Sequence, residues 1–152
     1  MNKFRPLTFD ELQLFEKEFR EYLAINGIDA DLWKDIKEND PDKAQSIMDL
    51  FGDVVFNTVL TKITYLERID DKGLKLFKYN PKEALLIGID GLTDKEQSIE
   101  HILSKAKKGD LSLFTLKKEH QKSREEEVFQ MIKLGCQVSD GELFEAFSRA
   151  IS

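Results

Sequence analysis

Residues 41–89 constrain the fold more than any other stretch, because one apolar-striped helix runs directly into three β-rich segments. Asp40-Pro41 is typical of a helix start: Asp is a good N-cap, and Pro at the first helical position gives up an amide that had no partner. Apolar residues then recur at helical spacing: Ala44, Ile47, Met48, Phe51, Val55 and Val59. Because neither element is stable with its apolar face in water, we expect this stripe to pack on one face of the sheet.

The three β-rich segments predict a three-stranded antiparallel meander. Turn sequences separate them at Asp70-Asp71-Lys72-Gly73 and Asn80-Pro81-Lys82-Glu83. The first two segments alternate in polarity, whereas Ala84–Ile89 is almost wholly apolar. A strand buried on both faces has that composition, so we expect the third strand to be central or covered on both sides.

Two further helices are predicted before this stretch. Thr8 with Glu11 forms a capping-box pattern that opens the first helix, and Asn26-Gly27 ends it. Asp29 is the expected N-cap of a second, shorter helix. The chain therefore begins with three helices.

A fourth strand and three more helices are predicted after the meander. Thr93 with Glu96 is a second capping pattern, and its helix ends at Gly109 before a strand over Leu111–Leu116. This helix could be a crossover, which would make the third and fourth strands parallel. Ser123 with Glu126 and Ser139 with Glu142 then open two C-terminal helices. The predicted fold is α+β in one domain over residues 1–152.

The two C-terminal helices also resemble a helix-turn-helix, because the turn Gly135-Cys136-Gln137-Val138 joins them. A DNA reader places the start of its second helix in the major groove. Here that start carries Asp140 and Glu142, whose charges repel phosphates. A helical hairpin packed on the domain is the favoured interpretation.

Charge and cysteine content restrict the partners and the compartment. The net charge of −6 opposes binding of nucleic acid, although one basic concentration could contact RNA or an acidic partner: Lys105, Lys107, Lys108, Lys117, Lys118, Lys122 and Arg124. The single Cys136 has no partner for an internal disulfide, which indicates a reducing compartment. No apolar run approaches the roughly 20 residues that span a bilayer. We expect a cytoplasmic protein without a membrane segment.

No strong catalytic signature is present in the sequence. There is no Gly-rich phosphate loop, no pair of cysteines at metal spacing and no nucleophile elbow, so we assign no cofactor, metal or catalytic residue. His101 and His120 each neighbour a carboxylate, which is close to chance. If a ligand binds, the first pocket candidates are Asp49, Asp53, Glu67 and His101, because grouped carboxylates with a histidine suit acid–base or cation-binding work.

Large apolar residues exceed what we expect a core of this size to bury. The resulting interface candidates are Trp33, Phe51, Phe56, Phe144 and Phe147.

Five stretches of the sequence are distinctive in order and spacing: Leu7-Thr8-Phe9-Asp10-Glu11-Leu12, Asn26-Gly27-Ile28, Asp49-Leu50-Phe51, Tyr65-Leu66-Glu67 and Ser139-Asp140-Gly141-Glu142-Leu143-Phe144. In these stretches the chain resembles a family of small uncharacterised cytosolic proteins from Bacteroidota, a domain of unknown function. Gly52 stands where the resemblance implies Ser, and Arg68 where it implies His. The resemblance implies a cytosolic single-domain protein and assigns no activity or functional site to it.

These observations rank three functions. The first is a non-catalytic protein-interaction or regulatory module whose partner is another protein or a second copy of the chain. The first alternative is a small-molecule-binding protein or an enzyme with a carboxylate-lined pocket. The second alternative is an RNA- or ribosome-associated factor that uses the lysine-rich region.

Overall fold

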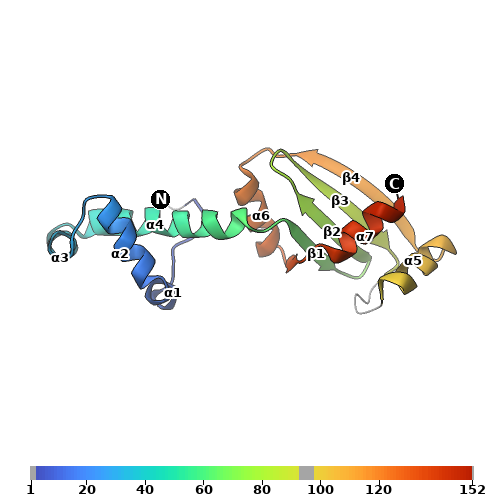
Figure 1. Ribbon diagram of the computed structural model, residues 1–152, viewed down its shortest axis with the longest axis horizontal. Coiled ribbons are helices and arrows are strands. Elements are labelled where there is room, and N and C mark those ends of the chain that lie inside the picture. Colours follow the sequence, from blue (N-terminus) through green and yellow to red (C-terminus); the bar gives the residue numbers. More distant parts are fainter. Residues whose placement is uncertain (1–2, 93–97, 152) are drawn as a thin grey trace. The chain divides into compact units, whose positions relative to one another are not determined.

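The computed structural model describes residues 3–92 and 98–151. These residues form seven helices and one five-stranded antiparallel sheet, which confirms the α+β prediction (Figure 1). The chain is organised in two compact units, Met1–Val59 and Leu60–Ser152. The single-domain organisation of residues 1–152 stays a prediction.

The N-terminal unit contains α1 (Phe9–Leu14), α2 (Glu16–Ile25), α3 (Ala30–Asn39) and most of α4 (Pro41–Thr61). The expected capping box of Thr8 and Glu11 forms, and the Asp29 side chain accepts a hydrogen bond from the backbone amide of Leu32. The first predicted helix is interrupted, because Phe15 ends α1 and precedes α2. None of the described helices is long and apolar enough to cross a membrane.

An aromatic cluster joins α2, α3 and α4. The ring of Phe51 on α4 lies 5.0 Å from Phe19 and 5.4 Å from Tyr22, both on α2. Trp33 on α3 meets Phe19 edge-on, with 5.2 Å between the ring centroids. The stripe of α4, which we expected to cover the sheet, thus supplies Phe51 to the core of the N-terminal unit.

The sheet of the C-terminal unit has the strand order β4-β3-β2-β1-β5. The predicted meander is confirmed as β1 (Tyr65–Ile69), β2 (Gly73–Tyr79) and β3 (Glu83–Asp90). β4 (Ser112–Glu119) pairs with β3, and β5 (Gln137–Ser139) pairs with β1. Sequence patterning missed β5, because three residues are too few to show alternation.

The predicted parallel pairing of the third and fourth strands is wrong. β3 and β4 are antiparallel, with Asp90 opposite Ser112. Helix α5 (Ile99–Lys107) has 9 residues and spans about 14 Å, whereas an eight-residue strand spans about 26 Å. Figure 1 shows α5 at the end of the sheet where β3 stops, so the chain re-enters the sheet from that same end. Thr93 and Glu96 lie outside the described residues, and Ser98 is the N-cap of α5.

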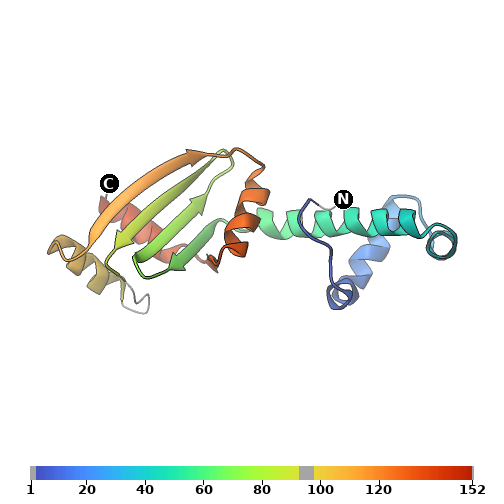
Figure 2. The same cartoon turned by 180° about the vertical axis from the view of Figure 1, so that it is seen from behind.

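Helices α5 and α7 (Glu142–Ile151) cover one face of the sheet, which we call the covered face (Figures 1 and 2). The core there comprises mainly Leu74 and Leu76 from β2, Ile87 and Ile89 from β3, Ile102 from α5, and Phe144 and Phe147 from α7. A polar clamp holds α7 to the sheet: the Glu145 carboxylate accepts hydrogen bonds of 2.8 Å from both the Lys78 ammonium and the Tyr65 hydroxyl. These two donors lower the pKa of Glu145.

The predicted turn between the last two helices contains β5, so α6 (Arg124–Lys133) and α7 are not a helix-turn-helix. Ser139 is a strand residue rather than the N-cap of α7. The chain instead turns at Gly141, which has φ of +83°. A Cβ atom at this position would lie 2.4 Å from the ring of Tyr65, so only glycine fits.

Arg124, at the start of α6, ties three parts of the chain together. Its guanidinium donates to the carbonyl of Leu60 in the last turn of α4 at 3.2 Å, and to the carbonyl of Tyr79 at the end of β2 at 3.0 and 3.1 Å. It also donates to the carbonyl of Ile63. The side chain is only 12% exposed, so these carbonyls have little water to replace the guanidinium.

We predict that Arg124→Met destabilises the protein by about 2–3 kcal/mol, because part-buried carbonyl acceptors lose a charged donor. Urea unfolding followed by far-UV circular dichroism measures the change. The control is Arg68→Met, which removes an exposed guanidinium from β1 and should cost less than about 0.5 kcal/mol. Equal losses for the two variants would contradict this role of Arg124.

Candidate functional site

The face of the sheet opposite α5 and α7, which we call the open face, carries a row of apolar side chains. Strand alternation places Phe77, Leu86 and Leu116 on it, and the register sets these residues side by side on β2, β3 and β4. The next row contains Tyr79, Ala84 and Lys118. Leu116 is 60% exposed, so this part of the sheet lacks the cover that the other face has.

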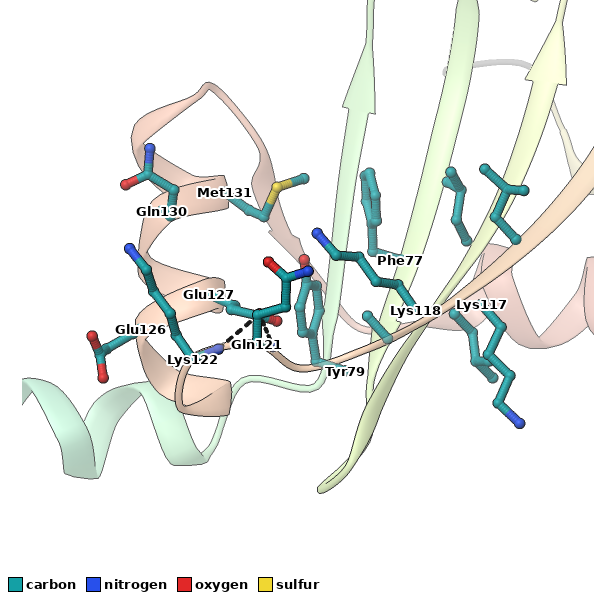
Figure 3. A pocket seen from close by; sticks show the side chains of 14 residues that line it. Phe77, Tyr79, Lys117, Lys118, Gln121, Lys122, Glu126, Glu127, Gln130 and Met131 are labelled. Atoms are coloured by element: carbon teal, nitrogen blue, oxygen red, sulfur yellow. Dashed lines mark hydrogen bonds between the residues drawn. The ribbon is translucent and has the colours of Figure 1, made fainter.

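A cavity of about 380 Å³ lies between this open face and α6 (Figure 3). Its floor comprises Phe77, Tyr79, Ala84, Leu86 and Leu116. Its α6 wall comprises Glu126, Glu127, Gln130 and Met131, and its mouth carries Lys118, Gln121 and Lys122. Leu85 and Lys117 also line it at the margin. This volume and an apolar lining with a few polar groups are typical of small-molecule sites.

The segment between β4 and α6 is fixed by the imidazole of His120. One ring nitrogen lies 2.8 Å from the Glu127 carboxylate and the other 2.8 Å from the carbonyl of Asn80. Both partners are acceptors, so the ring satisfies both only when each nitrogen carries a hydrogen. The ring also stacks on Tyr79, at an interplanar angle of 3°. Because both ring nitrogens are hydrogen-bonded within the protein, His120 has no nitrogen available to contact a substrate.

Glu127 fixes the same segment from the side of α6. Its second carboxylate oxygen accepts hydrogen bonds from the backbone amides of Gln121 at 2.8 Å and Lys122 at 3.3 Å. Burial acts to raise the pKa of Glu127, but the hydrogen bonds from the Gln121 amide, His120 and the Lys122 amide together lower it. The mouth of the cavity is therefore pre-organised around an ionised carboxylate.

Two other titratable groups near α6 are held in their neutral forms. Burial raises the pKa of Tyr79 to about 12, with smaller contributions in the same direction from Cys136 and Glu127. Burial also raises the pKa of the Cys136 thiol, which works against thiolate chemistry. Among the described residues, no three His, Cys, Asp or Glu side chains gather as a metal site would require.

The four predicted pocket residues lie on three elements. On α4, Asp53 accepts hydrogen bonds from the backbone amides of Lys3 and Phe4, and Asp49 accepts one from the Gln45 side chain. Glu67 lies on β1, opposite Gln137 of β5, and His101 is an exposed residue in the first turn of α5. Neither Glu67 nor His101 lines the cavity.

The predicted interface residues differ in their burial. Phe51, Phe144 and Phe147 are buried in the cores of their units. Trp33 and Phe56 are half-buried, and the Phe56 ring contacts Phe4 and the Arg5 guanidinium. The largest exposed fractions among apolar residues belong instead to Phe9, Leu14 and Ile25.

One stretch of the sequence indicated the cavity floor, although we expected protein rather than a cavity to cover it. The apolar run Ala84–Ile89 predicted a strand covered on both faces. Ile87 and Ile89 are covered by helices, whereas Ala84 and Leu86 face the cavity. Apolar residues on both sides of a strand show that both sides avoid water, without telling whether a helix or a ligand provides the cover.

The chain belongs to the Family of unknown function (DUF6495), whose model matches residues 1–152. Neither the search of curated proteins nor the search of solved structures finds a match.

We predict that Glu127→Gln destabilises the protein by about 1–2 kcal/mol at pH 7, because a charge-assisted acceptor of three donors becomes a neutral amide. The folded-state pKa of Glu127 is lowered from 4.5, so its contribution is present above pH 4.5 and is lost as the pH falls through the lowered pKa. Urea unfolding of wild type and Glu127→Gln at pH 7 and at successively lower pH measures the difference in their free energies of unfolding.

The matched control is Glu119→Gln, which changes an exposed carboxylate on β4 and should alter stability little at any pH. A gap between wild type and Glu127→Gln that stays constant from pH 7 to about pH 3 would contradict the assigned role of the carboxylate.

Proposed function

We propose that this chain is a non-catalytic binding module that takes a small, largely apolar molecule into the cavity between α6 and the open face. The observation that carries the proposal is the apolar row Phe77, Leu86 and Leu116, which no described helix covers fully and which α6 walls on one side. A ligand that covers these side chains removes apolar surface from water, at about 0.8 kcal/mol for each buried methylene.

Pre-organisation supports binding at this place. His120 and Glu127 fix the chain between β4 and α6, so the wall and the mouth need little ordering when a ligand enters. A site that is already ordered loses less conformational entropy on binding. A binding role also fits the chemistry of the site, because His120 is engaged at both nitrogens and the Cys136 thiol is buried.

A second candidate is the protein-interaction module, favoured by the open edge of β4. This strand lies at one end of the sheet order, pairs with β3 on one side only, and exposes Leu113 and Leu116. An extended segment of a partner protein, or β4 of a second copy, could add to this edge. The RNA-binding alternative has less support, because Arg124 is engaged by carbonyls and Lys117 lies 3.0 Å from Glu83.

We also propose that the chain works in the cytoplasm and originates from Bacteroidota. The unpaired cysteine supports a reducing compartment, and the sequence resemblance supports the source.

We predict that the uncharged fluorescent probe N-phenyl-1-naphthylamine binds the wild-type protein, and that Ala84→Trp weakens this binding at least about tenfold by filling the floor of the cavity. Fluorescence titration measures the affinity, and circular dichroism checks that each variant folds. The matched control is Leu113→Trp, on the covered face of β4, which should bind like wild type. Equal affinities for all three proteins would place the probe elsewhere and contradict the proposal.

A further inference from the structure

We propose that the ligand of this cavity is an amphiphile with an anionic headgroup, whose apolar body lies on Phe77, Leu86 and Leu116 and whose headgroup meets Lys118 and Lys122. This inference rests on the proposed function and adds the charge of the ligand and its orientation.

The charges on the two faces of the sheet support an anion. On the open face, strand alternation places the cations Arg68, Lys75 and Lys118, and the one acid is Asp90 at the end of β3. The covered face instead pairs its cations with acids: Lys78 with Glu145 at 2.8 Å and Lys117 with Glu83 at 3.0 Å. The cations of the open face are a local exception in a chain of net charge −6.

The carboxylates beside the cavity are already engaged. Glu127 accepts hydrogen bonds from His120 and from two backbone amides. The Glu126 carboxylate accepts a hydrogen bond of 2.9 Å from the Ser123 hydroxyl. In contrast, the ammonium groups of Lys118 and Lys122 have no hydrogen bond or ion pair with another residue in the described part of the chain. The mouth therefore offers unpaired positive charge.

The positions of these groups set the orientation of the ligand. Figure 3 shows the Lys118 side chain reaching across the sheet towards α6, above the apolar floor, while Lys117 points away. Lys118 is paired across the strands with Ala84, one row from Leu86 and Leu116, so its charge lies at the margin of the apolar row. An anionic head at this margin lets the apolar body follow the row inward. A ligand with a cationic head would meet like charge there.

The test measures binding of decanoate to the intact chain by calorimetry, together with displacement of N-phenyl-1-naphthylamine by decanoate, decan-1-ol, decylamine and acetate. We expect decanoate to bind more tightly than decan-1-ol, decylamine to bind most weakly of the decyl compounds, and acetate not to compete. Lys118→Glu should weaken decanoate about five- to tenfold and leave decan-1-ol unchanged, because an exposed ion pair is replaced by repulsion. Lys122→Glu should act in the same direction.

The matched control is Lys72→Glu, which makes the same charge change in the exposed turn between β1 and β2. Equal affinities for decanoate and decan-1-ol, or equal losses in Lys118→Glu and Lys72→Glu, would overturn the anionic headgroup while leaving the apolar site intact. Competition by acetate would show that the lysines bind a small anion without the floor, and would also overturn this inference. If wild type binds neither decanoate nor the probe, both the proposed function and the inference fail.

Discussion

The guanidinium of Arg124 is the interaction on which the arrangement of the C-terminal unit depends most. Arg124 is the first residue of α6. Its guanidinium donates hydrogen bonds to backbone carbonyls at the end of α4, in the segment that follows and at the end of β2. Arginine suits this task because its planar group presents five donors in a fixed geometry. By fixing the start of α6, Arg124 also fixes Glu127 one turn later, and Glu127 in turn holds His120 and the mouth of the cavity.

Both faces of the sheet carry apolar side chains, but the helices cover one face more completely than the other. On the covered face, α5 and α7 pack Ile102, Phe144 and Phe147 onto the strands, so the fold itself removes the apolar surface of this face from water. On the open face, α6 covers one part only, and Leu116 stays largely in solvent. Gly88 lies next to Leu86 on this face of β3, and the Phe114 ring occupies the space that a Cβ at position 88 would fill, at 2.1 Å. Exposed apolar surface beside a pre-organised wall is expected where a molecule binds.

Local patterns predicted the secondary structure well, because local chemistry determines it. The caps at Thr8, Asp29 and Ser123 lie where the sequence placed them, and so does the meander. Three long-range features were missed or misjudged: the direction of β4, the short strand β5 and the packing of Phe51. Each depends on which surfaces meet, and apolar periodicity describes only one surface at a time. The cavity was not predicted from the sequence, because only the register of β3 and β4 brings Leu86 and Lys118 close together.

The division into two units has a spectroscopic consequence. Trp33 is the single tryptophan of the chain, and it packs against Phe19 inside the N-terminal unit. The sheet unit contains Tyr65 and Tyr79 but no tryptophan. Emission excited at long ultraviolet wavelength therefore reports the packing of α2 and α3 alone, whereas far-ultraviolet ellipticity sums the helices and strands of both units. The natural sequence thus carries an optical reporter confined to one unit, and melting curves from the two signals coincide only if the units lose their order together.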